Sequence, residues 1–138
     1  MSKEPAVFHL AIPTHDLDAA EDFYTRVIGA VRARRYDDRV TFRFFDHQVV
    51  CHLDPDSVDM NQGDPFANLY PRHFGITFRD KSEFDALYER CQSSGWSLVK
   101  EVFERFGGYP ERHQTFFVAD PSHNLIEFKW YEDSRFVY

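Results

Sequence analysis

Arg72-His73-Phe74-Gly75-Ile76-Thr77-Phe78 is a short apolar run with one histidine near its start. The same pattern occurs near the N-terminus as Phe8-His9-Leu10-Ala11-Ile12. The two histidines are 64 positions apart, and the same offset aligns the residues that follow each run. It places Ala20, Phe23, Tyr24 and Val27 on Phe84, Leu87, Tyr88 and Cys91. A match in spacing and chemistry over about 20 residues indicates an internal duplication, in which each unit opens with a histidine-bearing strand.

The composition is that of a folded chain with a substantial core. Its 138 residues are 43% hydrophobic and 17% aromatic, the size of one domain or of two half-domains that share a core. A net charge of −7 argues against nucleic acid as a partner, because phosphate binding needs clustered Lys and Arg. We expect the short basic run 32–35 on a solvated strand or turn, and the alternative is an anion site.

The sequence favours a cytoplasmic protein with no membrane partner. No stretch approaches the ~20 apolar residues of a membrane span, and the first five residues hold no apolar signal core. Two cysteines, Cys51 and Cys91, are too few for a disulfide framework in a chain of this length. We therefore expect two thiols in a reducing compartment.

The first unit is predicted as a strand, a helix and three strands. Alternation over 7–12 places His9 on one face and the bulky apolar side chains on the other, and Pro13 is expected to end the strand. The helix is predicted to begin at the N-cap Asp18 and to stop at Gly29. The three strands that follow are expected at 31–36, 39–45 and 48–53.

The second unit repeats this order after a linker rich in Pro, Asp and Asn. Its helix is predicted to begin at the N-cap Ser82 and to end near Gly95. Its later strands are expected at 97–104, 114–119 and 124–130, with a Gly-rich loop at 105–113. The predicted class is α+β, with two tandem βαβββ modules in one domain. Their bounds are about 6–54 and 72–131, joined by linker 55–71 and followed by tail 132–138.

Glu127 is the acidic residue that this pattern singles out. It sits inside the apolar strand Leu125-Ile126-Glu127-Phe128, where a buried carboxylate needs a cation beside it. Alternation puts Glu127 on the face opposite the helix, and it puts His73 and His9 on the equivalent faces. If the two modules pair about a pseudo-twofold axis, the three groups converge. Two imidazoles and one carboxylate then form a metal site with open positions, suited to Fe(II), Mn(II) or Zn(II).

Each residue also has a less specific interpretation. One strand histidine is more often a hydrogen-bonded core or surface residue than a metal ligand, and one strand glutamate is usually solvated. The repeat favours the metal site, because both histidines occupy the same place in both modules.

These residues, with Asp120-Pro121-Ser122-His123-Asn124-Leu125-Ile126-Glu127 near the end, resemble the vicinal oxygen chelate superfamily. That group includes glyoxalase I, bleomycin-resistance proteins and type I extradiol dioxygenases. The chain is most similar to small predicted extradiol-type dioxygenases over 44–53 and 124–129. The resemblance implies a cup-shaped mixed sheet with helices outside, and it implies His9, His73 and Glu127 as metal ligands. It also implies a homodimer, in which modules pair within one chain or are exchanged between chains.

Three positions depart from the family pattern. The last strand of the first module, aligned with the last strand of the second, places Cys51 where some members carry a fourth ligand. A Cys51 thiolate would favour zinc; the preferred interpretation is a small buried residue, with water in that coordination position. Phe117 stands where extradiol enzymes carry a tyrosine, ten residues before the final glutamate. His123 replaces the usual turn glycine, either as a turn variation or as an extra polar group near the rim.

Acid–base candidates lie on or beside the long loop of the second module. His113 and Tyr109 are the catalytic candidates, since a histidine titrates near working pH; the alternative is that both are ordinary loop residues. His15 and His47 are expected in turns and receive no role. Phe103, Phe106 and Phe116 are expected in the core, and the alternative is an apolar pocket.

The predicted function is a divalent-metal-dependent enzyme for a small substrate with vicinal oxygens. The favoured form is a catechol-cleaving dioxygenase with Fe(II), and Mn(II), Zn(II) or Ni(II) are alternative metals. The second form is a glyoxalase-type isomerase or lyase that needs no oxygen. The third hypothesis is a metal-free binding protein for a small molecule such as an antibiotic. The complete His9, His73 and Glu127 set argues against it, because such binders lack the ligands.

Overall fold

The computed structural model describes residues 4–60, 63–67 and 69–138, and it contains two βαβββ modules in tandem. The first module comprises β1 (His9–Thr14), α1 (Leu17–Asp22), the π-helical turn η1 (Phe23–Val27), β2 (Val31–Arg35), β3 (Arg39–Phe44) and β4 (His47–Leu53). The second comprises β5 (Phe74–Phe78), α2 (Lys81–Ser93), β6 (Val99–Arg105), β7 (His113–Ala119) and β8 (Leu125–Tyr131). Short 3₁₀ turns, η2 (Pro55–Ser57) and η3 (Ser134–Phe136), follow the two modules.

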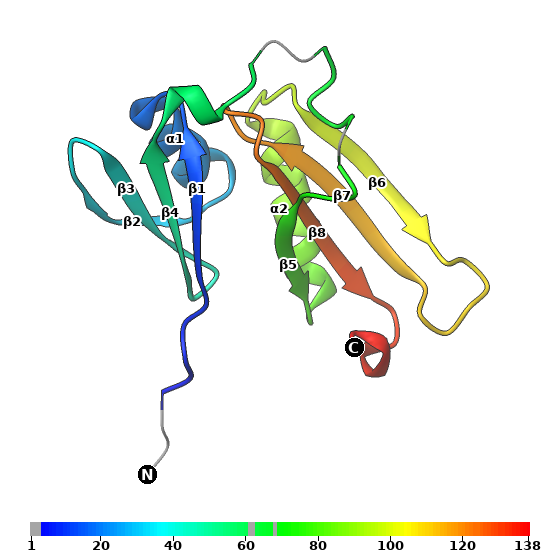
Figure 1. Cartoon of the computed structure of the whole chain (residues 1–138). Helices are drawn as coiled ribbons and strands as arrows, with labels where there is room; N and C mark the ends of the chain where they lie inside the picture. Colours follow the sequence, from blue (N-terminus) through cyan, green and yellow to red (C-terminus); the bar gives the residue numbers. More distant parts are fainter. Residues whose placement is uncertain (1–3, 61–62, 68) are drawn as a thin grey trace.

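Each module forms one mixed four-stranded sheet. The strand orders are β1-β4-β3-β2, called sheet A here, and β5-β8-β7-β6, called sheet B. β1 runs parallel to β4 and β5 parallel to β8, and the remaining pairs are antiparallel. The modules stand side by side, with β1 and β5 at their facing edges (Figure 1). The predicted α+β class and the tandem modules are therefore confirmed.

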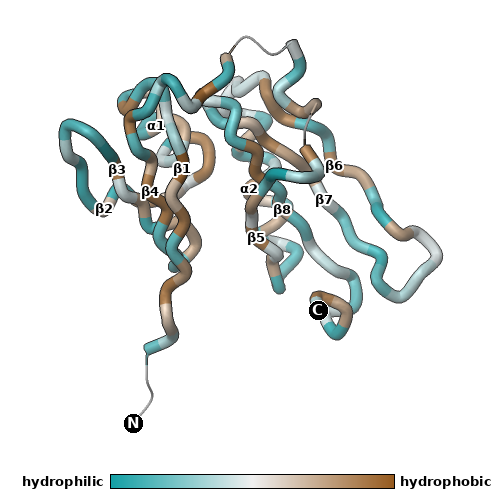
Figure 2. The backbone as a smooth tube through the Cα atoms, viewed as in Figure 1, coloured by the Kyte–Doolittle hydropathy of each residue, from teal (hydrophilic) through white to brown (hydrophobic). Residues whose placement is uncertain are grey.

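One hydrophobic core joins the two modules. The Phe44 ring lies 6.0 Å from that of Phe74 and 6.4 Å from that of Phe128, measured between centroids. Buried side chains from α1, α2 and both sheets belong to the same cluster. Hydrophobic colouring follows β1 and β4, while the β2–β3 hairpin is largely hydrophilic (Figure 2). Both sheets thus turn their helix-packed faces to the shared core, and the opposite faces are the outer faces of the molecule.

The first strand and both helix starts differ from the sequence prediction. β1 continues through Pro13 to Thr14, because β1 is an edge strand, where a proline costs no interstrand hydrogen bond. The first helix is capped by Asp16, not Asp18, and the Asp16 side chain accepts a hydrogen bond from the Ala19 N–H. The second is capped by Asp80, not Ser82.

Candidate metal centre

The outer face of sheet B brings His73 and Glu127 together. β5 and β8 are neighbouring parallel strands, with Gly75 opposite Glu127, and His73 immediately precedes β5. His73 Nε2 lies 3.2 Å from Glu127 Oε1. Gly75 allows this close approach, because a Cβ atom there would collide with the backbone carbonyl of Glu127.

Each partner of this pair is oriented by a second hydrogen bond. His73 Nδ1 donates to the backbone carbonyl of Leu69 at 2.8 Å, so the lone pair of the neutral ring is on Nε2. The Thr115 hydroxyl donates to Glu127 Oε2 at 2.8 Å. Nε2 and Oε1 therefore remain as two adjacent, correctly oriented ligand atoms. Such outer hydrogen bonds are typical of histidine and carboxylate metal ligands.

Aromatic side chains form an apolar wall beside the pair. Phe117 pairs directly with Glu127 in the sheet, and its ring meets that of His73 edge-on at 5.9 Å. Phe103 stacks on Phe117 at 6.0 Å. The position expected to carry a tyrosine thus offers no hydroxyl and instead shields Glu127, of which 8% is exposed.

His9 lies on the other module and does not join this pair within one chain. It is exposed on the outer face of sheet A, and its Nδ1 donates to Gln48 Oε1 at 2.5 Å. Among the described residues, no three His, Cys, Asp or Glu side chains form a group that could hold a metal ion. The reason is the shared core, which leaves His9 and the His73–Glu127 pair on the outer faces of different sheets.

Cys51 is not the structural counterpart of Glu127. Ala11 pairs with Val50, and Gly75, the repeat equivalent of Ala11, pairs with Glu127. Val50 therefore occupies the equivalent position, which is one residue earlier than the sequence alignment placed it. Cys51 faces the shared core and is fully buried. Burial raises the pKa of its thiol, which disfavours the thiolate that a metal would need.

The two acid–base candidates occupy different surroundings. His113 is 6% exposed and stacks on Tyr131 with ring centroids 4.4 Å apart. It shares the outer face of β7 with Thr115, two residues and therefore about 7 Å along the strand. Tyr109 is 61% exposed in the turn before β7. The fold thus brings His113 toward the His73–Glu127 pair and leaves Tyr109 at the loop tip.

The turn before β8 accommodates His123 in an unusual backbone conformation. Its φ is +63°, a region in which glycine is favoured, so the turn keeps the shape that a glycine would adopt. His123 and His73 both line a cavity of about 560 Å³ between the facing edges of the modules. His123 Nδ1 is buried without a hydrogen-bond partner among the described residues.

Sequence reasoning did not identify Thr115 or Leu69 as supporting residues. The available signal for Thr115 was its alternation with Phe117, which places both on the face of Glu127. Leu69 gave no signal, because it acts through its backbone carbonyl. In the part of the chain that is described, no helix has the length and apolar character needed to cross a membrane.

Comparison with known proteins agrees with this architecture. The family model of the glyoxalase/bleomycin resistance protein/dioxygenase superfamily matches residues 6–128. A glyoxalase/bleomycin resistance protein/dioxygenase from Alicyclobacillus acidocaldarius is 50% identical, with both chains covered completely and a TM-score of 0.88. A search of curated proteins gave no match.

More distant solved structures share the fold alone. Lactoylglutathione lyase from Agrobacterium tumefaciens is 21% identical, with 93% of this chain and 95% of that chain covered and a TM-score of 0.65. The fosfomycin resistance protein FosX from Listeria monocytogenes is 15% identical, with 98% and 100% covered and a TM-score of 0.71. From its sequence match and its paired βαβββ modules, the chain belongs to the glyoxalase/bleomycin resistance protein/dioxygenase superfamily.

Proposed function

We propose that the protein is a divalent-metal-dependent enzyme that binds a small substrate through two adjacent oxygens. One observation carries the proposal: the two repeat-related histidines have the same hydrogen-bonding arrangement. Nδ1 of His9 donates to Gln48, and Nδ1 of His73 donates to the Leu69 carbonyl. Each ring therefore presents Nε2 as a lone-pair donor, which is the form that metals bind.

The donor set fits a divalent cation. Glu127 is a buried carboxylate, and its polar neighbours among the described residues are the Thr115 hydroxyl and the His73 imidazole. A buried negative charge of this kind is stabilised by a cation. Two imidazoles and one carboxylate are typical ligands of Fe(II), and they also accept Mn(II), Zn(II) or Ni(II).

The third ligand, His9, would come from a second copy of the chain. His9 faces outward on sheet A, and the His73–Glu127 pair faces outward on sheet B. A twofold dimer that stacks sheet A of one protomer against sheet B of its partner would complete two identical sites. Closed twofold dimers are the commonest symmetric assemblies.

The favoured reaction is ring cleavage of a catechol by a dioxygenase with Fe(II). The bound metal would supply Lewis-acid activation of the two substrate oxygens. Glu127 accepts a hydrogen bond from the Thr115 hydroxyl, which orients its carboxylate toward the site. Phe117 and Phe103 exclude water from one side, and His113 on the same face is the residue proposed to move a proton.

A second candidate reaction is an isomerase or lyase of the glyoxalase type. Phe117 favours it, because the position where extradiol enzymes place a tyrosine hydroxyl carries none here. Neither candidate requires a membrane or nucleic acid, and both suit a cytoplasmic enzyme.

Metal analysis followed by substrate panels tests the proposal. We expect purified protein to retain a near-stoichiometric divalent metal. After anaerobic loading with Fe(II), oxygen uptake with a catechol panel would identify the dioxygenase, and turnover of α-ketoaldehyde hemithioacetals without oxygen would identify the glyoxalase type. A protein that stays empty when offered iron, manganese, nickel and zinc in turn would refute the proposal and leave the metal-free binder.

A further inference from the structure

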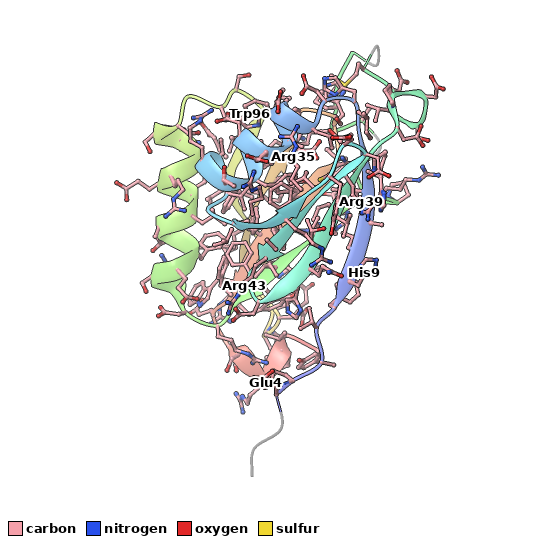
Figure 3. The ribbon with its side chains drawn as sticks, turned by 90° about the vertical axis from the view of Figure 1, so that its left-hand side faces the viewer. Glu4, His9, Arg35, Arg39, Arg43 and Trp96 are labelled. Carbon is pink, nitrogen blue, oxygen red and sulfur yellow. The ribbon has the colours of Figure 1, made fainter. Side chains whose placement is uncertain are left out.

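The outer face of sheet A, which carries His9, also carries Arg34, Arg39 and Arg43, in a protein of net charge −7. His9 pairs with Gln48, and Gln48 pairs with Arg43, so these three residues form one row across three strands. In the next row Thr41 pairs with Arg34. With strands about 4.8 Å apart, Arg43 begins about 10 Å from His9, within reach of a long side chain. Figure 3 shows Arg39 and Arg43 toward the two ends of β3 and His9 on β1.

A further cavity opens on this face. It has a volume of about 270 Å³, and Arg34, Thr41, Arg43 and Gln48 are among its lining residues. This volume accommodates one acidic group and a few further atoms. The cavity thus lies beside the row that contains a proposed metal ligand.

The charges of the cavity do not cancel. Arg43 donates through Nε and Nη2 to Asp46 Oδ1, at 3.0 and 2.6 Å, and this pair is neutral together. The Arg34 side chain makes no hydrogen bond or ion pair with the described residues. By contrast, Arg35 points to the opposite face and binds Asp18 and Glu21. Arg34 therefore contributes one uncompensated positive charge.

The uncharged lining also offers donors. Thr41 is only 3% exposed, and its hydroxyl makes no hydrogen bond to the described residues. Thr41 lines the cavity together with Arg34 and Arg43, so its hydroxyl can donate to a bound group. Gln48 uses its oxygen toward His9, so its amide N–H groups remain free to donate. His47 Nδ1 accepts from the Phe8 N–H, which places the ring proton on Nε2.

We infer that this cavity, here called the sheet A subsite, binds an oxyanion group of the substrate. The occupant is a carboxylate, phosphate or phosphonate, since these accept several hydrogen bonds and pair with a guanidinium. The inference rests on the proposed function in one respect: it assigns the anion to the substrate whose vicinal oxygens lie near His9. The substrate class is then an acidic molecule with two adjacent oxygens.

Titration with inorganic phosphate and with acetate, at constant ionic strength set by chloride, tests the subsite. Arg34→Gln is expected to weaken binding of the preferred anion by about tenfold or more, as hydrogen bonds to charged groups do. Thr41→Val, which keeps the side-chain shape, is expected to weaken it several-fold. The matched control is Arg35→Gln, which removes the same charge from the next residue on the other face and should leave affinity within about twofold.

The outcomes separate this inference from the proposed function. Equal losses in Arg34→Gln and Arg35→Gln would show diffuse surface charge and overturn the subsite, as would no loss in either. Anion binding that disappears in Glu127→Gln but survives in Arg34→Gln would place the anion at the metal and also overturn it. Arg34-dependent binding in a protein that retains no metal would keep the subsite and refute the metalloenzyme. The tighter of the two anions identifies the acidic group.

Discussion

His73 Nε2 and Glu127 Oε1 lie 3.2 Å apart on neighbouring parallel strands. His73 Nδ1 donates a hydrogen bond to the Leu69 carbonyl, and Glu127 Oε2 accepts one from the Thr115 hydroxyl. A ligand pair that is already oriented loses little conformational entropy when a cation binds.

Glu127→Gln should abolish metal retention and leave the fold intact. The amide keeps the shape of the side chain but removes the negative charge that the cation requires. Metal content by mass spectrometry should fall below about one-tenth of the wild-type value. Replacing a residue that only supports a ligand typically lowers metal affinity by about 10–100-fold, and replacing the ligand itself should lower it at least as much. Glu101→Gln, on the exposed surface of β6, is the control and should retain the metal.

Thr115→Val should weaken metal affinity by about 10–100-fold, the range typical of residues that orient a ligand. The hydroxyl holds Glu127 Oε2, and valine fills the same volume without that hydrogen bond. Competition with a chelator measures the affinity. Thr25→Val, at a helix surface position where the hydroxyl bonds only backbone carbonyls, should leave affinity unchanged, and equal losses in both variants would contradict the assignment.

His9→Ala and Glu127→Gln should each be inactive, and a mixture refolded together should regain activity. In a mixed twofold dimer, His9 of one protomer and the His73–Glu127 pair of its partner still complete one site. With equal amounts and random pairing, about a quarter of all sites should be restored. Metal content and activity of the mixture measure this fraction. If the mixture regained neither activity nor metal, each site would be formed within one chain.

Gly75→Ala should destabilise the protein and release the metal together. The new methyl group would collide with the backbone carbonyl of Glu127 and force β5 and β8 apart. Overpacking of this kind costs about 1–3 kcal/mol of unfolding free energy. Urea unfolding gives that value, and metal content reports the displacement of Glu127. Gly107→Ala is the control, because its methyl group would approach only the exposed Glu104 carboxylate at 3.6 Å.

Tyr24→Phe should destabilise the protein more at pH 7 than at pH 4. Tyr24 donates to the fully buried carboxylate of Asp120 at 2.8 Å, and burial raises the pKa of Asp120 despite the donors around it. The folded carboxyl therefore keeps its proton to a higher pH than the unfolded one. The Asp120 carboxyl therefore stabilises the folded state fully at pH values below its unfolded pKa. That stabilisation is lost as the pH rises through its raised folded pKa.

Removal of the Tyr24 hydroxyl raises the pKa of Asp120 further. The loss of unfolding free energy in Tyr24→Phe therefore grows with pH. At pH 7 we expect about 1.5–3 kcal/mol, the cost of a hydrogen bond to a charged group, and a smaller loss at pH 4. Tyr88→Phe is the control and should change stability by less than about 0.5 kcal/mol at either pH. An equal loss for Tyr24→Phe at both values would show that Asp120 does not titrate as described.

The duplicated unit and the strand faces were predictable because both are local patterns. Alternation of bulky and small side chains placed Leu10 and Ile12 against the core and Ile126 and Phe128 in it, as the structure confirms. The N-caps were wrong by two residues. Asp16 and Asp18 both suit a cap by type, and the burial of Leu17, which local sequence does not show, selects the first.

The sequence alignment paired Glu127 with Cys51 and not with Val50, because the turns before the two last strands differ in length by one residue. Four residues, 44–47, separate the paired residues Arg43 and Gln48, whereas five, 120–124, separate Ala119 and Leu125. The additional residue in the second turn shifts every later equivalence by one. The separation of His9 from its expected partners depends on which sheet faces form the core, a long-range choice that strand periodicity leaves open.

The aromatic contacts of Phe44 with Phe74 and Phe128 bear on how such a chain arose. An isolated half would expose this apolar surface to water, so a half-length ancestor would have been stable only as a self-associated pair. Fusion of two such halves would make that association independent of protein concentration, since a tether replaces free encounter by a high effective concentration. The sequences of the two outer sheet faces would then be free to diverge. Sheet B carries Glu127, and sheet A carries arginine side chains.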